Sequence, residues 1–329
     1  MTRIAVVGAG MSGLVVARRL SAFGDVTVFE KSRGPGGRMS TRYADAFEFD
    51  HGAQYFTARS TAFHAFLQPL IDAGEVATWQ PTVAQFDGHR MTGHKSRSEH
   101  EQRYVGTPRM NRIGKRIAEG LDLRLGSEIA GMQRDEGSWT LEFADASLSG
   151  PYDWLILAAP APQTAVLARA HPELVKFCAP RVMRGCFALM LGFDEPLDLG
   201  WQAAEIRNSP IGWIAVNSSK PDRGAPYTLV VHSANDWADA HIDDDRDPVI
   251  KLILDECSAI VGSNVRAATH CQLHRWRYAN ADRSTGAAYF LDRSSRLAAC
   301  GDWCIRGRVE EAFTSGDELA KALSTLLRE

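Results

Sequence analysis

The 329-residue sequence lacks the long apolar run that a membrane-spanning helix needs. The apolar stretch Trp154–Ala168 is too short to cross a bilayer, and Pro160 and Pro162 interrupt it. Glycines also interrupt the apolar start of the chain, which ends at Arg18 and so differs from a signal peptide. We therefore expect a cytoplasmic protein that makes no contact with a membrane.

Disulfide, metal-binding and nucleic-acid signals are scarce as well. The six cysteines have no CxxC spacing, so we expect mostly buried, reduced thiols, with a redox pair at Cys300 and Cys304 as the alternative. The ten histidines show no metal-ligand spacing, and we predict no metal. A net charge of −3 gives no reason to expect nucleic acid as a partner. Basic residues between Arg97 and Arg116 form a solvated face or contact an anionic ligand.

A dinucleotide-binding fingerprint stands at the start of the chain. The apolar run Ile4–Val7 precedes Gly8-x-Gly10-x-x-Gly13, and Leu14–Leu20 follows with the character of a helix. In this pattern Gly8 permits a tight turn, Gly10 lets the backbone approach a pyrophosphate, and Gly13 allows close packing of helix and strand. The N-terminus of the helix offers N–H groups and a positive dipole end to the phosphates.

An acid and a second glycine-rich loop follow the fingerprint. The predicted strand Asp25–Glu30 ends in an acid about twenty residues past the glycines, where Glu30 accepts hydrogen bonds from ribose hydroxyls. The stretch RGPGGRM at residues 33–39 allows another close backbone approach, and Arg38 supplies a guanidinium suited to pyrophosphate oxygens. Taken alone, this loop also fits an ordinary surface turn. Together the two loops resemble those of FAD-binding amine oxidase and glutathione-reductase-like flavoproteins, and this resemblance favours FAD over NAD.

The sequence contains a single GxGxxG fingerprint and no Gly-x-Ser-x-Gly elbow. We therefore expect neither a separate NAD(P)H-binding domain nor a hydrolase nucleophile. Electrons must then come from a substrate that docks directly at the flavin, with dioxygen as the final acceptor.

The pattern along the chain predicts an α/β fold with a discontinuous Rossmann-type FAD domain and a second α+β substrate domain on a largely antiparallel sheet. The FAD domain takes residues 1–58, 105–160 and 296–329, and the substrate domain takes 59–104 and 161–295. Expected elements are a helix near Met110–Glu119, a hairpin-like pair at Trp139–Phe143 and Trp154–Ala159, strands at Cys186–Phe193, Gly212–Asn217, Tyr227–Ala234 and Cys271–Tyr278, and a helix from the N-cap Asp247 and Pro248 to Gly262.

Three further stretches resemble FAD-binding amine oxidase and glutathione-reductase-like flavoproteins. Asp50–Phe56 resembles the loop that lies under the isoalloxazine ring in these proteins. Gly301-Asp302 resembles the motif whose aspartate binds the ribityl chain. Arg308–Ala312 resembles the start of the helix that faces the flavin N1–C2=O edge. The sequence resembles the renalase family, in its bacterial branch, over nearly the whole chain. The stretches that carry this resemblance are KSRGPGGRMSTR, DHGAQYFTAR and LAACGD. Amine oxidases usually have a small residue where Glu310 or Glu311 stands, and their aromatic Trp–Pro–Gly segment is missing here.

No cysteine lies within the Val309 motif, so we expect non-covalent FAD. The resemblance implies oxidation of misreduced NAD(P)H isomers, which carry hydride at the 2- or 6-position of the nicotinamide, with release of hydrogen peroxide. Together with the fingerprint it implies FAD contacts at Gly8, Ala9, Gly10, Ser12, Gly13, Glu30, Lys31, Gly37, Arg38, Met39, Gly52, Ala53, Gln54, Ile129, Gly301, Asp302 and Val309. The flavin N5 accepts the hydride, and no side chain is identified as catalytic.

Candidate substrate contacts are Thr57, Arg59, Ser96, Cys186, Asn217, His232, Trp276 and Ile305. A surface arginine at Arg59 and a satisfied core histidine at His232 are the alternatives for those two positions. Other functions that fit the sequence are an amine oxidase, a flavin monooxygenase that uses NAD(P)H, and an escort protein without flavin. Retention of Glu30, Arg38 and Asp302 argues against the escort.

Overall fold

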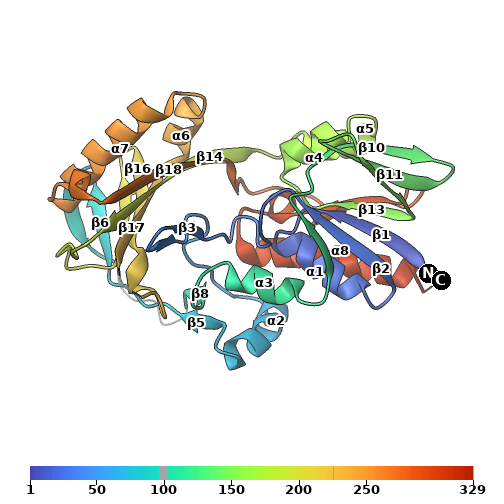
Figure 1. The fold of residues 1–329 in the computed structure, drawn as a ribbon, viewed down its shortest axis with the longest axis horizontal. Coiled ribbons are helices and arrows are strands. Elements are labelled where there is room, and N and C mark those ends of the chain that lie inside the picture. The colour runs from blue at the N-terminus through green and yellow to red at the C-terminus, as the bar shows by residue number, and fades with distance from the viewer. Residues whose placement is uncertain (96–101, 225, 329) are drawn as a thin grey trace. The chain divides into compact units, whose positions relative to one another are not determined.

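The structure, a computed structural model, describes residues 1–95, 102–224 and 226–328 and comprises two compact units (Figure 1). Unit 1 consists of Met1–Met39, Ile113–Met183 and Asn280–Glu329, and unit 2 of Ser40–Arg112 and Arg184–Ala279. The sequence-based FAD domain has different boundaries: its residues 40–58 and 105–112 fall in unit 2, while residues 161–183 and 280–295 of the predicted substrate domain fall in unit 1.

Unit 1 has a six-stranded sheet of the Rossmann type. Its order is β19 (Tyr289–Asp292), β20 (Leu297–Cys300), β13 (Trp154–Leu157), β1 (Thr2–Val7), β2 (Gly24–Glu30) and β9 (Asp122–Leu125). All neighbours pair in parallel except β19 and β20, which are antiparallel. The continuous apolar runs of β1 and β13 suit central strands that are covered on both faces.

Both faces of this sheet are covered. Helices α1 (Met11–Leu20) and α8 (Val309–Leu326) lie on one face in Figure 1. On the other face, Ala5, Val7 and Leu155 pack against the three-stranded antiparallel sheet of β10 (Ile129–Asp135), β11 (Ser138–Phe143) and β12 (Leu148–Tyr152). The remaining helical elements of the unit are α3 (Arg112–Ala118), α4 (Ala161–Leu167), α5 (Pro172–Cys178) and η3 (Asp302–Cys304).

The predicted hairpin between Trp139–Phe143 and Trp154–Ala159 is wrong. β11 pairs with β10 and β12, whereas β13 runs parallel to β1 in the larger sheet. β12 is the second strand of the hairpin that begins with β11, although its sequence LSGPY has little strand character.

Unit 2 is built on a seven-stranded sheet that is largely antiparallel, as predicted. Its order is β18 (His270–Ala281), β14 (Met183–Phe193), β17 (Tyr227–Ser233), β16 (Ile211–Val216), β15 (Ala203–Arg207), β6 (Val83–Asp87) and β7 (Arg90–His94). The four strands expected in this domain are confirmed. Smaller elements are α2 (Thr61–Asp72), β5 (Val76–Thr78), β8 (Tyr104–Gly106), η1 (Asn217–Ser219) and η2 (Val265–Ala267).

The alternation of side chains divides this sheet into two faces. Leu189, Val231 and Ile214 face one another across three strands and are buried in the core with α7 (Arg246–Val261) and residues of α6 (Asn235–His241). On the opposite face Met190 and Val230 pack against the hairpin of β3 (Arg42–Ala44) and β4 (Phe47–Phe49). This second face also carries His232.

Helix α7 begins two residues earlier than predicted. Its N-cap is Asp245 rather than Asp247, because proline is tolerated throughout the first turn and Pro248 does not force the start. Its predicted end is confirmed: Gly262 has φ of 68°, the left-handed conformation that favours glycine.

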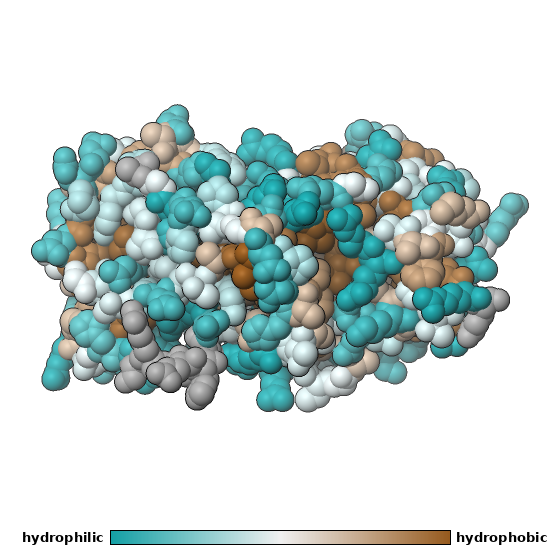
Figure 2. All heavy atoms as spheres, turned by 90° about the horizontal axis from the view of Figure 1, so that it is seen from below, coloured by the Kyte–Doolittle hydropathy of each residue, from teal (hydrophilic) through white to brown (hydrophobic). Residues whose placement is uncertain are grey.

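No helix among the described residues is long and apolar enough to span a membrane. Hydrophilic side chains cover most of the face shown in Figure 2, where hydrophobic residues gather in separate patches. All six cysteines are free thiols, and all but Cys271 are buried. Burial raises the pKa of Cys300 to about 12, so this thiol stays protonated and no disulfide joins it to Cys304.

Candidate functional site

The first glycine loop of unit 1 connects β1 to α1. Gly8 has φ of 110°, and a Cβ on Gly13 would lie 2.0 Å from the carbonyl oxygen of Gly8. Both glycines are therefore required by the packing of the loop itself. A Cβ on Gly10 would meet no atom within 4 Å. Open space thus lies directly beside Gly10, at the N-terminus of α1, where no side chain caps the helix.

The second glycine loop packs on the first. The amide of Gly36 donates to the carbonyl of Ala9 at 2.8 Å, and a Cβ on Gly37 would lie 3.2 Å from the Cα of Gly10. Gly37 has φ of 56°, so this approach needs a residue without a side chain. The two glycine loops therefore form one cradle.

The carboxylate of Glu30 lies beside this cradle and is 7% exposed. It accepts hydrogen bonds from the amide of Ala9 at 2.8 Å and from the amide and hydroxyl of Ser32 at 2.8 and 2.6 Å. A carboxylate offers about four lone-pair positions, so three protein donors leave capacity for a ribose hydroxyl.

Arg38 and Asp302, both predicted FAD contacts, lie together in unit 1. The guanidinium donates to the carboxylate at 2.5 Å, and the side chain of Asp302 is 5% exposed. The preceding Gly301 donates its amide to Ser315 at 2.9 Å, which joins this corner to α8. The start of α8 at Val309 has no side-chain cap, and its first turn carries Glu310 and Glu311.

The other predicted FAD contacts fall into three groups. Ser12, Met39 and Ile129 are buried in unit 1, and Lys31 is exposed after the end of β2. Gly52, Ala53 and Gln54 belong to unit 2. The open space at Gly10, the spare acceptor capacity of Glu30 and the guanidinium of Arg38 fit the pyrophosphate and ribose of an adenine dinucleotide such as FAD.

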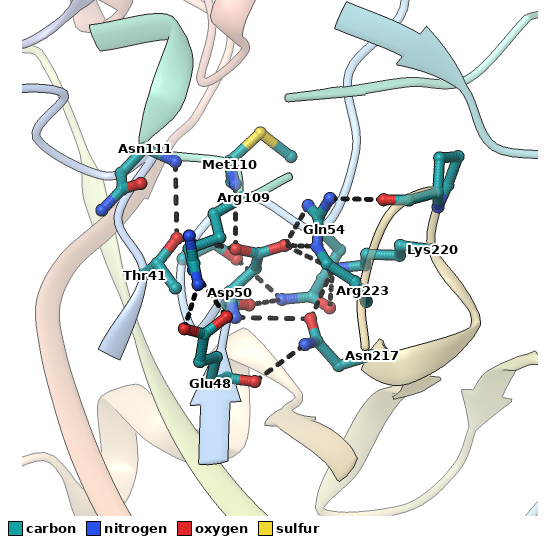
Figure 3. A network of polar contacts seen from close by, with 12 residues as sticks. Thr41, Glu48, Asp50, Gln54, Arg109, Met110, Asn111, Asn217, Lys220 and Arg223 are labelled. Carbon is teal, nitrogen blue, oxygen red and sulfur yellow. Dashed lines mark hydrogen bonds and ion pairs between the residues drawn. The ribbon is translucent and has the colours of Figure 1, made fainter. Parts of the chain in front are cut away.

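Unit 2 contains a buried polar network around Asp50 (Figure 3). One oxygen of its carboxylate accepts from Thr41 at 2.7 Å and from the amide of Met110 at 3.0 Å, while the other accepts from Arg223 at 2.6 Å. Lys220 lies 3.5 Å from the same second oxygen. Burial raises the pKa of Asp50, but the charges of Lys220 and Arg223 and these hydrogen bonds outweigh it, so the pKa lies below 3.8.

Asn217, a predicted substrate contact, is a bridge within this network. Its Oδ1 accepts from the amide of Asp50 at 3.3 Å and from Lys220 at 3.0 Å, and its Nδ2 donates to the carbonyl of Glu48 at 3.0 Å. The carboxylate of Glu48 forms a bidentate pair with Arg109. The amide group of Asn217 is thus engaged inside unit 2 at both of its ends.

An aromatic group adjoins the network. His51 stacks on Trp276, with ring centroids 5.2 Å apart, and its carbonyl accepts from Trp276 at 2.9 Å and from His232 at 3.1 Å. His274 meets both rings edge-on. Burial lowers the pKa of His51 to about 3 and those of His232 and His274 to about 4, so all three imidazoles are neutral at pH 7. The described residues contain no group of His, Cys, Asp or Glu arranged to hold a metal ion.

The structure thus brings His232, Trp276 and Asn217 together beside the loop that contains Gln54. Burial raises the pKa of Cys186 to about 12, and its thiol faces Ser233. Thr57 and Arg59 precede α2, and Ile305 lies in unit 1, where its carbonyl accepts from the amide of Ser284. Ser96 lies outside the described residues.

Lys220 and Arg223 were not predicted as site residues from the sequence. The one signal was local: the polar stretch Asn217–Arg223 directly follows an apolar strand. Nothing in that stretch identifies Asp50 as its partner, because 173 positions separate Asp50 from Arg223.

Comparison with known families identifies the class of protein. Residues 82–324 match the family of flavin-containing amine oxidoreductases, and residues 6–70 match the NAD(P)-binding Rossmann-like domain. The chain belongs to the flavin-containing amine oxidoreductase family. The glycine cradle with Glu30 and Arg38 is the part of the structure that suits a flavin dinucleotide.

Curated relatives match over a short segment. The zeta-carotene-forming phytoene desaturase of Myxococcus xanthus is 55% identical over 51 residues, and a 4,4'-diapophytoene desaturase of Staphylococcus haemolyticus is 58% identical over 50. Each match covers 15% of this chain and 10% of the desaturase.

Solved structures match over the full length. A putative protoporphyrinogen oxidase from Exiguobacterium sp. 255-15 has a TM-score of 0.78 at 12% identity, with 98% of both chains covered. Reduced UDP-galactopyranose mutase has a TM-score of 0.77 at 13% identity, with 100% of this chain and 95% of that one covered. Putrescine oxidase bound to putrescine has a TM-score of 0.72 at 13% identity, with 99% of both covered. At these identities the likeness establishes the fold alone.

Proposed function

We propose that the protein is an FAD-dependent oxidase of misreduced NAD(P)H isomers, the 2- and 6-dihydronicotinamide forms. The substrate loses a hydride, dioxygen takes up both electrons, and with one proton the products are NAD(P)+ and hydrogen peroxide. Bound FAD supplies the two-electron acceptor and passes the electrons to dioxygen. Aromatisation of the nicotinamide drives hydride loss, so the reaction needs no side chain that removes a proton.

The charge of the polar network in unit 2 is the observation that supports the proposed substrate. Asp50 is the one carboxylate of unit 2 among the buried side chains of the described residues, and Lys220 and Arg223 both pair with it. The neighbouring imidazoles are neutral at pH 7. The buried residues of this part of unit 2 therefore offer no free anion to an ammonium group, whereas a neutral dihydronicotinamide can stack on the partly exposed ring of Trp276, which His51 supports from its buried side.

The number of Rossmann-type nucleotide-binding sheets also supports the proposed substrate. Within residues 1–95, 102–224 and 226–328, the Rossmann-type parallel sheet of unit 1 is the single one of its kind. A reductase with a separate NAD(P)H domain does not fit this arrangement, so the reductant must bind as the substrate itself.

Anaerobic mixing of the FAD-loaded protein with three reductants tests the proposal. Borohydride-generated NADH isomers should bleach the flavin absorbance rapidly, and air should restore it with formation of peroxide. Bleaching by a panel of amines alone would make the protein an amine oxidase, and bleaching by authentic NADH alone a reductase or monooxygenase. Trp276→Phe should raise the KM for the isomers. The matched control is Trp237→Phe, because Trp237 packs in the core on the α7 side of the sheet.

A further inference from the structure

Lys220 is a completely buried cation in unit 2. Its ammonium group has three acceptors: Asn217 Oδ1 at 3.0 Å, Gln54 Oε1 at 3.2 Å and Asp50 Oδ2 at 3.5 Å (Figure 3). An ammonium group has three N–H donors, so each donor is matched by one acceptor. Lys220 is therefore saturated, and it serves neither as a nucleophile nor as an open binding site.

The contact with Gln54 fixes the orientation of that side-chain amide. Gln54 Oε1 faces Lys220, and Gln54 Nε2 donates to the carbonyls of Asp50 and Gly52, the latter at 3.1 Å. A flipped amide would turn its NH2 group toward the ammonium and its oxygen toward two carbonyls. The side chain of Gln54 thus closes the turn between Asp50 and Gln54, and the hydrogen bond from Lys220 fixes the orientation of that side chain.

We propose that Lys220 is a positioning residue that locks the Gln54 amide and, with it, the turn of residues 52–54. The inference rests on the proposed function, because Gly52, Ala53 and Gln54 are predicted to contact the flavin. Deprotonation would leave Lys220 with two N–H donors for three acceptors, so the turn is fully held in its flavin-binding geometry only while Lys220 carries its proton.

The charged and titratable groups that face Lys220 are Asp50, Arg223 and His232, and the ring of Trp79 lies 5.6 Å from its nitrogen. Burial lowers the pKa of Lys220 to about 8; the charge of Asp50 opposes this shift and that of Arg223 adds to it. Between this value and 10.5, the pKa of an ordinary lysine, the unfolded chain keeps the proton that the native protein has lost. Deprotonation of Lys220 therefore favours the folded state as the pH rises.

The direction of this pH effect on stability distinguishes a positioning role of Lys220 from a role in stabilising the fold. Loss of the flavin contact above pH 8 cannot be caused by unfolding through Lys220, because the same titration stabilises the fold. The experiment compares wild-type protein with Lys220→Met, Lys220→Arg and the control Lys95→Met. Lys95 pairs with Glu205 at 2.6 Å in the same unit, but its side chain is 40% exposed.

Three readouts are measured: FAD affinity, the visible spectrum of bound flavin between pH 6 and 10, and hydrogen exchange of the amides of residues 51–56 without FAD. Wild-type protein should show a spectral inflection near pH 8. Lys220→Met should weaken FAD binding about tenfold at pH 7 and speed exchange in the turn, because a charged hydrogen bond is lost. Lys220→Arg should restore the affinity and abolish the inflection, because arginine does not titrate in this range.

Affinity and exchange in Lys220→Met equal to those of Lys95→Met would overturn the inference, and so would an inflection that persists in Lys220→Arg. The wild-type titration needs no variant, so it decides the question if Lys220→Met fails to fold. Wild-type protein that takes up no FAD would overturn the proposed function, whereas the exchange measurement without FAD would still report whether Lys220 holds the turn.

Discussion

The guanidinium of Arg38 donates to the carboxylate of Asp302 at 2.5 Å, although 264 positions separate the two residues. One belongs to the second glycine loop and the other to η3, and the parallel sheet of unit 1 brings these segments together. The pair places a fixed positive group and a buried acid at one end of the glycine cradle. Because each holds the other in place, a flavin should find both preorganised.

Asp302→Ala should therefore weaken FAD binding about tenfold or more, because it removes the predicted ribityl acceptor and the ion pair of Arg38 with η3. Titration of FAD-free protein with FAD, followed by flavin fluorescence, measures the change. Asp122→Ala is the control, since Asp122 pairs with Arg124 at 2.8 Å on the surface. Equal flavin occupancy in both variants would contradict the placement of the ribityl chain.

Two glycines of the fingerprint should respond to alanine in opposite ways. Gly10→Ala adds a Cβ that meets nothing within 4 Å, so it should cost no more than about 1 kcal/mol of stability while it blocks the pyrophosphate. Gly13→Ala places its Cβ 2.0 Å from a backbone oxygen and should cost about 3 kcal/mol or more. Urea unfolding and FAD titration of both variants separate the effects. A Gly10→Ala protein that binds FAD normally would exclude the pyrophosphate from this position.

The glycine loops could be predicted because their pattern is local. Spacing and turn requirement lie within Gly8–Gly13, and the predicted helix follows them, although α1 begins at Met11, three residues before the predicted Leu14. The hairpin prediction failed because strand pairing is not local: the apolar run of β13 fits a hairpin as well as a central parallel strand. The buried network around Asp50 escaped prediction for the same reason, since Lys220 and Arg223 resemble surface residues until the fold buries them.

Acid should destabilise the protein through His232. Burial lowers its pKa to about 4, while the bond to the carbonyl of His51 opposes the shift and the charge of Lys220 adds to it. The unfolded chain, with a pKa near 6.5, binds the proton more strongly. The contribution of His232 to the free energy of unfolding is thus complete above pH 6.5. It decreases by about 3 kcal/mol as the pH falls from 6.5 through 4.

His232→Gln should reduce this dependence by the share of His232, because glutamine also donates to the carbonyl of His51 but does not titrate. His51 and His274, whose pKa values burial lowers to about 3 and about 4, keep their own shares. Urea unfolding at pH 7 and pH 4.5 measures it, with His94→Gln as the exposed control. A slope in His232→Gln as steep as in the control would show that His232 is not the responsible group.

Asn217 should be more important for stability than its strand-end position suggests. Its side chain is 2% exposed and links Asp50, Glu48 and Lys220. Asn217→Ala removes the acceptor from two buried donors, the ammonium of Lys220 and the amide of Asp50, and we expect a loss of about 2–4 kcal/mol. Asn217→Asp keeps the acceptor for Lys220, so it should cost less than alanine even though it cannot donate to Glu48.

Asn264→Ala is the matched control, because Asn264 caps the short helix η2 through a bond to Arg266 at 3.1 Å on the surface. Its loss should cost no more than about 1 kcal/mol in the same urea experiment. An Asn217→Ala variant as stable as this control would mean that water or a neighbouring side chain replaces the amide. The order alanine below aspartate below wild type would instead establish that Asn217 stabilises the fold through the oxygen that accepts from Lys220 and from the amide of Asp50, and also through its donation to Glu48.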